Sequence, residues 1–152
     1  MNIGDTAPDF VLPDHQGRRW QLSEALTASP VVLFFYPGAM TIGCTMETCH
    51  FRDLGAEFSA LGATRVGVSA DPANVQREFA TRTAVDFPLL SDEDGFVGSL
   101  YGARRNFALR PGKRATFVIA MDGSIRGIIT SELRMQKHAD EALDILRATS
   151  VV

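Results

Sequence analysis

The two cysteines of this chain, Cys44 and Cys49, are the residues whose type and spacing most directly suggest chemistry. Cys44 follows a Pro-Gly pair and precedes apolar residues at helical spacing, which places it in the first turn of a predicted helix. The first N–H groups of a helix lack intrahelical partners and the helix dipole is positive there, so a thiol at this position loses its proton more readily. Cys44 is therefore either a nucleophilic thiolate or, like many free cysteines, a small buried apolar residue.

The five-residue spacing of the cysteines sets a condition on any bond between them, and it differs from a Cys-x-x-Cys motif. In a continuous helix this step rises about 7.5 Å and turns about 140°, which separates the two Cα atoms by roughly 8.7 Å. A disulfide requires Cα atoms within about 6.8 Å. We therefore expect Cys44 and Cys49 to bond only when the first turns unwind, as a redox switch with two conformations. Gly43 and the polar residues of these turns make a weak helix, which suits local unfolding.

Composition excludes several classes of protein. The chain has 152 residues, is 45% hydrophobic and has a net charge of −3, which predicts one ordinary domain over residues 1–152 and argues against nucleic-acid binding. No apolar run approaches the roughly 20 residues of a membrane span, and no secretory signal is visible. Two cysteines are too few for a disulfide framework, so we expect a cytoplasmic protein without membrane or nucleic-acid partners.

The elements that must position Cys44 follow from the hydrophobic pattern. An apolar run over residues 31–36, rich in β-branched and aromatic side chains, predicts a buried strand that the following Pro-Gly pair ends. Thr41 is placed to cap the next helix through its hydroxyl oxygen. Helical spacing then continues to near Gly62.

The remaining segments predict a mixed sheet with helices around it. The Asp71-Pro72 pair predicts a helix start, with Asp71 as N-cap and Pro72 as the first helical residue. Other expected elements are an N-terminal hairpin over 10–22, strands at 65–70, 86–90, 115–120 and 124–130, and helices at 95–101 and about 136–148. Strand-helix-strand units favour parallel pairing and the late hairpin favours antiparallel pairing, so the sequence predicts an α/β fold with a mixed central β-sheet flanked by helices.

The residues around Cys44 form a motif that resembles a known family. Residues 35–44 read Phe-Tyr-Pro-x-x-x-Thr-x-x-Cys, a second cysteine follows five residues later, and residues 51–53 read Phe-Arg-Asp. This pattern is similar to that of the peroxiredoxins, in particular the peroxiredoxin Q (bacterioferritin comigratory protein) group. Segments 4–10, 87–92 and 114–119 extend the resemblance over nearly the whole chain. It implies a thioredoxin-like fold.

The resemblance also implies a thiol-dependent peroxidase. Cys44 would be the peroxidatic residue that reduces hydrogen peroxide or organic hydroperoxides and becomes a sulfenic acid. Cys49 would resolve it as an intramolecular disulfide, which thioredoxin or a similar dithiol reductant reopens. Arg114 would lie against the thiolate and polarise the peroxide. Thr41 would act beside the sulfur, as helix cap or as hydrogen-bonding partner, and Pro37 would shield the sulfur from water.

Two further residues are candidates for support of the site. The main-chain N–H of Gly43, like that of Cys44, points out of the helix start and is placed to bind a peroxide oxygen. Glu47 matches a glutamate often found between the two cysteines of the family, and either orients Arg114 or is a surface charge. We expect no cofactor and no bound metal, and a monomer or weak homodimer.

Three alternatives stay open from the sequence. One is a peroxidase that uses a single cysteine, and a second is a redox-regulated protein of thioredoxin fold that binds partners without peroxidase turnover. The third is a metal site built from Cys44, Cys49 and His50. The other histidines, His15 and His138, are isolated in the sequence, whereas a closed zinc site needs four ligands in spaced pairs.

Overall fold

The fold is organised around a five-stranded mixed β-sheet with the strand order β5-β4-β3-β6-β7. The structure, a computed structural model, describes residues 1–103 and 114–149. The sheet consists of β3 (Val31–Phe35), β4 (Thr64–Ser69), β5 (Leu89–Ser91), β6 (Ala115–Ile119) and β7 (Ile125–Thr130). β3 pairs in parallel with β4 and antiparallel with β6, so the predicted mixed sheet is confirmed and the strand before Cys44 lies at its centre.

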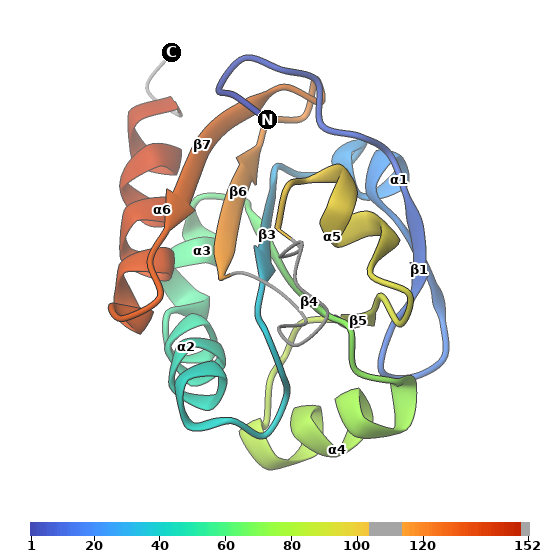
Figure 1. The fold of residues 1–152 in the computed structure, drawn as a ribbon. Helices are drawn as coiled ribbons and strands as arrows, with labels where there is room; N and C mark the ends of the chain where they lie inside the picture. Colours follow the sequence, from blue (N-terminus) through green and yellow to red (C-terminus); the bar gives the residue numbers. More distant parts are fainter. Residues whose placement is uncertain (104–113, 150–152) are drawn as a thin grey trace.

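Helices cover both faces of this sheet (Figure 1). One face packs against α2 (Ile42–Asp53), α3 (Gly55–Ala60), α4 (Ala73–Thr83) and α6 (Met135–Thr149). The other face packs against α1 (Leu22–Leu26) and α5 (Phe96–Leu100), with the N-terminal hairpin of β1 (Val11–Pro13) and β2 (Arg19–Gln21) at that side. No helix among the described residues is long and apolar enough to cross a membrane.

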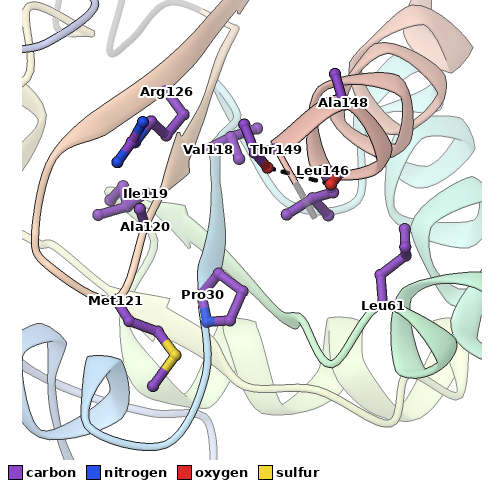
Figure 2. A pocket seen from close by; sticks show the side chains of 10 residues that line it. All are labelled: Pro30, Leu61, Val118, Ile119, Ala120, Met121, Arg126, Leu146, Ala148 and Thr149. Atoms are coloured by element: carbon purple, nitrogen blue, oxygen red, sulfur yellow. Dashed lines mark hydrogen bonds between the residues drawn. The ribbon is translucent and has the colours of Figure 1, made fainter. Parts of the chain in front are cut away.

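A cavity of about 450 Å³ lies at the end of the sheet where β3 begins (Figure 2). Its wall includes Pro30 before β3, Val118 of β6 and Leu146 of α6. None of the residues expected to perform chemistry lines it, because Cys44 follows the opposite end of β3.

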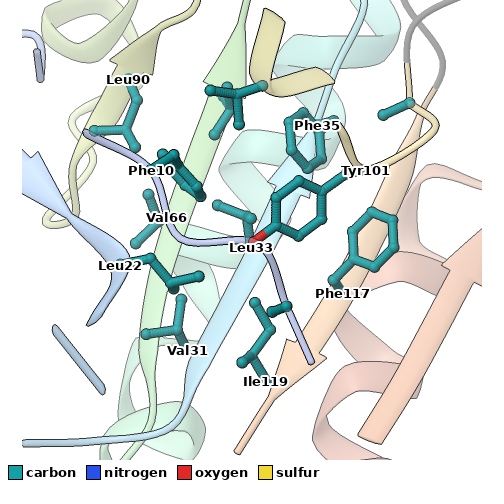
Figure 3. Close-up of a cluster of buried hydrophobic side chains, with 14 of the residues drawn as sticks. Phe10, Leu22, Val31, Leu33, Phe35, Val66, Leu90, Tyr101, Phe117 and Ile119 are labelled. Carbon is teal, nitrogen blue, oxygen red and sulfur yellow. The ribbon is translucent and has the colours of Figure 1, made fainter. Parts of the chain in front are cut away.

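Alternation along β3 divides the interior into two apolar cores. Val31, Leu33 and Phe35 face the core beneath α1 and α5, which Figure 3 shows, with Tyr101 and Phe117 nearby. The intervening Val32 and Phe34 face the core beneath α2 and α6, and this second core includes Cys44. Because successive side chains of a strand point to opposite faces, a continuous apolar run is what a central strand covered on both faces requires.

The helix expected to run from residue 41 to near Gly62 is interrupted, with α2 ending at Asp53 and α3 beginning at Gly55. The carbonyl of Phe51 would normally accept from the N–H of residue 55, and here it accepts from Arg65 Nη1 at 2.8 Å. A side chain at Gly55 would also lie 3.3 Å from Arg65 Nη2. The buried arginine therefore explains the break, which hydrophobic spacing alone could not reveal.

The expected cap of α4 is also wrong. The N-cap of α4 is Pro72, and no side chain of the described residues caps this helix. The Asp71 carboxylate instead accepts from the Ala39 N–H and the Ser69 hydroxyl, each at 2.7 Å. Asp71 thus connects the end of β4 to the loop before Cys44 rather than starting a helix.

Candidate active site

Cys44 lies in the first turn of α2 and is fully buried. Thr41 is the N-cap, and its Oγ1 accepts from the Cys44 N–H at 3.3 Å, as the sequence predicts. The same hydroxyl donates to the Gly38 carbonyl at 2.9 Å. Its hydrogen is therefore directed to the loop and not to the sulfur, so in this state Thr41 acts as a cap and a loop clamp.

The loop between β3 and α2 has a constrained backbone. Met40, directly before the cap, has φ of 68°, in the left-handed region that few residues other than glycine occupy. The Asp71 carboxylate fixes the loop through the Ala39 N–H. Pro37 is half-buried in this loop, between the end of β3 and the capped helix start. Such strain is typical of functional sites, where the surrounding structure holds it in place.

Arg114 contacts the Cys44 sulfur although the two residues lie 70 positions apart. Phe35, at the end of β3, pairs with Ala115, at the start of β6, so the sheet brings the residue before β6 next to the loop that leads into α2. Arg114 Nη2 lies 3.4 Å from Cys44 Sγ, and Nη1 donates to Glu47 Oε1 at 2.7 Å. Only 5% of Arg114 is exposed, so its charge acts on both groups with little screening by water.

Glu47 is fully buried, so it is not the surface charge that was one of the two expectations. The 2.7 Å contact between its Oε1 and Arg114 Nη1 fits the other expectation, that Glu47 orients Arg114. Burial raises the pKa of Glu47 to about 8, although Arg114 acts in the opposite direction. Its second oxygen, Oε2, is buried and has no hydrogen-bond partner among residues 1–103 and 114–149. His138 Nδ1 lies 3.6 Å from this oxygen.

His138 is the site neighbour that sequence reasoning missed, since the sequence shows it as an isolated histidine. It is fully buried on α6, where Nδ1 lies 2.8 Å from Thr116 Oγ1 and Nε2 lies 2.9 Å from the Ser131 carbonyl oxygen. The sequence signal that could have indicated its burial is its helical spacing, since it lies next to the inward-facing Ala139 and four residues before the buried Ala142.

Gly43 allows Arg114 to approach the sulfur. A Cβ atom at this position would lie 3.2 Å from Arg114 Nη2 and 3.4 Å from Met135 Sδ. The Gly43 N–H has no intrahelical acceptor in the first turn. The Cys44 N–H, by contrast, donates to Thr41 Oγ1 and is not free for a ligand. Of the two main-chain donors expected to bind a peroxide oxygen, Gly43 and Cys44, this leaves Gly43.

Both cysteines are free thiols within the wound α2, Cys44 buried and Cys49 half-buried. This arrangement is the reduced, unbonded state of the pair. His50 does not join them, because its Nε2 lies 2.8 Å from Asp140 Oδ1 on α6. Large apolar side chains are exposed at the helix start, with Ile42 83% and Met46 52% exposed.

The arrangement thus combines a buried sulfur, a guanidinium in contact with it and a main-chain N–H of the first helical turn, which has no acceptor within its own helix. These are the groups that a reaction needs when a thiolate attacks a bond and negative charge appears on the leaving atom.

Comparison with known proteins finds one matching family, similar solved structures and similar sequences. The AhpC/TSA family matches residues 3–128. The crystal structure of the peroxidoxin BcpB from Mycobacterium tuberculosis is similar, with 51% identity, a TM-score of 0.93 and 97% of each chain covered. A mutant of PrxQ from Xylella fastidiosa has 29% identity and a TM-score of 0.89, covering 99% of this chain and 98% of that one. The chloroplastic peroxiredoxin Q of Sedum lineare is 37% identical, over 95% of this chain and 77% of that protein.

Proposed function

Because this chain belongs to the AhpC/TSA family of peroxiredoxins and is a thiol-dependent peroxidase, we propose that Cys44 is its peroxidatic residue. The observation that carries this assignment is the 3.4 Å contact between Arg114 Nη2 and a fully buried sulfur at a helix start. The guanidinium and the positive end of the helix both place positive charge beside the sulfur, where the attacking atom carries negative charge.

In the first step the Cys44 thiolate attacks one oxygen of a hydroperoxide in line with the O–O bond. An S–O bond forms, the O–O bond breaks, and its electron pair leaves with the second oxygen, which takes up a proton to become an alcohol or water. Arg114 and the Gly43 N–H stabilise the charge that develops on the oxygens. Thr41 holds the helix start and the loop in place, and Pro37 limits the access of water to the sulfur.

In the second step Cys49 resolves the sulfenic acid. The Cys49 thiolate attacks the Cys44 sulfur, an S–S bond forms, and the hydroxyl leaves as water after protonation. The wound α2 holds the sulfurs apart, so residues 44–49 unwind before this bond forms. Thioredoxin or a similar dithiol then reduces the disulfide by thiol–disulfide exchange and restores α2.

We propose that both hydrogen peroxide and organic hydroperoxides are substrates. The exposed Ile42 and Met46, with Met40 in the preceding loop, supply apolar surface at the helix start for an alkyl group. We further propose that residues 1–152 act as one domain, in the cytoplasm, as a monomer or weak homodimer. The single sheet that carries both cores supports one domain, and the low cysteine content, two in 152 residues, supports a reducing compartment.

Two cysteine variants test this assignment. Cys44→Ser should abolish peroxide consumption, whereas Cys49→Ser should retain one rapid oxidation and lose turnover with thioredoxin and thioredoxin reductase. Stopped-flow loss of thiol and a coupled NADPH assay measure the two steps. Normal cycling of Cys49→Ser would show a one-cysteine mechanism, and peroxide consumption by Cys44→Ser would overturn the proposal.

A further inference from the structure

His138 is a buried group that the proposed mechanism leaves unused. Its Nδ1 lies 3.6 Å from Glu47 Oε2, which has no hydrogen-bond partner among the described residues. We propose that His138 is a positioning residue of the peroxidase site: it favours the neutral form of Glu47, so that Arg114 directs its charge to the Cys44 sulfur. This inference rests on the proposed function, since it assigns a task to a residue that does not touch the sulfur.

The hydrogen bonds of His138 fix the tautomer of its ring. The Ser131 carbonyl can only accept, so Nε2 carries a hydrogen and donates to it. In the neutral ring Nδ1 is then an acceptor, and the Thr116 hydroxyl donates to it. Burial lowers the pKa of His138, and the nearby Arg114 lowers it further, so the neutral ring is favoured.

The neutral ring therefore presents the electron-rich Nδ1 to Glu47 Oε2, 3.6 Å away. Because this nitrogen carries no hydrogen and its lone pair accepts from Thr116, it gives Oε2 no hydrogen bond. A carboxylate oxygen beside it is repelled by the lone pair, whereas an oxygen of a neutral carboxyl group carries less negative charge and is repelled less. If Glu47 carries a proton, Oε2 is a better position for it than Oε1, because Oε1 already accepts a hydrogen bond from Arg114 Nη1. The lone pair of Nδ1 therefore favours neutral Glu47 in the reduced protein. Burial acts in the same direction, because it raises the pKa of Glu47.

Charge balance links this proton to the sulfur. The charged or titratable groups around Glu47 are Cys44 on its own helix, Arg114 before β6, Glu132 in the segment after β7, and His138 with Lys137 on α6. If Glu47 and Cys44 were both ionised, two buried anions would share one guanidinium. With Glu47 neutral, the thiolate and Arg114 form a balanced pair, which is the less costly arrangement in a buried site.

The inference predicts a pH profile that depends on His138. In the wild type the rate constant for Cys44 oxidation should fall on the alkaline side near pH 8, where Glu47 ionises. In His138→Ala, water that enters the vacated space should hydrate the carboxylate, so this fall should move to lower pH and the rate at neutral pH should drop about tenfold. Added imidazole should restore part of the rate. Stopped-flow oxidation across the pH range measures these effects.

Glu47 must mediate the effect if the inference holds. Glu47→Gln should remove the alkaline fall, and adding His138→Ala to Glu47→Gln should then leave the shape of the pH profile unchanged. His50→Ala is the matched control, because His50 also joins α2 to α6, through Asp140, but at the surface. It should oxidise with the wild-type profile.

A measurement on the intact wild type covers the case in which His138→Ala fails to fold. The infrared spectrum of the reduced protein at neutral pH should contain a protonated-carboxyl band that Glu47→Gln lacks. Absence of this band, or a wild-type pH profile in folded His138→Ala, would overturn the inference. Peroxide consumption by Cys44→Ser would instead overturn the proposed function, so the two failures are distinguishable.

Discussion

A single guanidinium serves two acidic groups in this site, and its shape explains how. Arg114 directs Nη2 to the Cys44 sulfur and Nη1 to Glu47 Oε1, so two nitrogen atoms of one rigid planar group contact the two acids. A lysine ammonium would have to contact both from a single nitrogen atom on a flexible stem. The Glu47 carboxyl group fixes the orientation of the Arg114 guanidinium. The position of the positive charge at the Cys44 sulfur therefore depends on a residue that does not contact the substrate. Small displacements of the guanidinium should therefore affect the rate more than the stability.

The tight contact at Gly43 offers a test at the scale of one residue. In Gly43→Ala the new Cβ would meet Arg114 Nη2 at 3.2 Å and push it away from the sulfur. We expect peroxide oxidation to slow about tenfold while the melting temperature changes little, since alanine also gains up to about 1 kcal/mol of helix propensity. Stopped-flow kinetics and thermal unfolding measure the two effects.

Gly38→Ala is the control for this prediction. It introduces the same methyl group into the loop that leads to α2, where the nearest atom is Thr41 Cγ2 at an ordinary 3.7 Å. It should oxidise at nearly the wild-type rate. Equal slowing of both variants would show that a general loss of loop mobility, and not displacement of Arg114, limits the reaction.

The site residues differ in how far the sequence reveals them. Cys44 and Thr41 follow from local rules, because a helix start and its cap lie within a few residues of each other. The proximity of Arg114 depends on the pairing of β3 with β6, which no local pattern contains, and only the family resemblance predicted it. His138 required the packing of α6 against α2, so neither spacing nor resemblance indicated it.

At the scale of elements, α2 carries polar atoms on its buried face between the two cysteines. Glu47 Oε2 and Thr48 Oγ1 are both buried, and neither has a hydrogen-bond partner in the part of the chain that the structure describes. Each such atom destabilises the wound helix by about 1–3 kcal/mol relative to a hydrated state. When residues 44–49 unwind, both atoms can reach water, so the buried face itself lowers the free energy of the opening that disulfide formation needs.

Replacement of Thr48 by valine tests this account. Thr48→Val keeps the branched shape and removes the unpartnered hydroxyl, so it should stabilise the wound helix by about 1 kcal/mol. Disulfide formation after a peroxide pulse should then slow about fivefold, with the initial oxidation of Cys44 unchanged. Rapid acid quench, thiol alkylation and mass spectrometry follow the two steps separately.

Thr45→Val on the same helix is the comparison variant. The Thr45 hydroxyl is not orphaned, because it donates to the Thr41 carbonyl at 2.7 Å. Its removal should not slow disulfide formation. If Thr48→Val resolves as fast as the wild type, the unpartnered hydroxyl does not contribute to the opening of α2.

Two differences between the predicted and observed elements, the break after Asp53 and the cap of α4, have a common cause, which is a polar contact from another part of the fold. Arg65 of β4 donates to the Phe51 carbonyl, and α2 ends there. The Asp71 carboxylate, which the sequence assigned to the cap of α4, instead accepts from the Ala39 N–H in the loop before Cys44. Hydrophobic spacing predicts which segments form helices because it reports burial. It does not predict their ends, which depend on hydrogen-bond competition across the tertiary structure.

At the scale of the whole molecule, the fold places the site at the carboxyl end of the central strand. β3 has neighbours on both edges and helices on both faces, so its end is fixed from all sides (Figure 1). The alternation of strands and helices along the chain predicts a mixed sheet of this kind. The order β5-β4-β3-β6-β7 depends on pairings between distant segments, and the sequence pattern alone does not select it.

The buried carboxyl group also predicts how global stability depends on pH. The pKa of Glu47 rises from 4.5 to about 8 on folding because of burial, so the folded chain keeps a proton that the unfolded chain releases. The stability linked to this proton is fully present below pH 4.5 and is lost as the pH rises to about 8. Glu47→Gln has no such proton, so the difference in unfolding free energy between variant and wild type should shift in favour of the variant by up to about 1.4 kcal/mol per pH unit over this range. Urea unfolding at a series of pH values measures the difference, in which groups common to both proteins cancel. A difference that stays constant between these limits would show that Glu47 is ionised in the folded protein, and the balance of charge at the sulfur would then need another explanation.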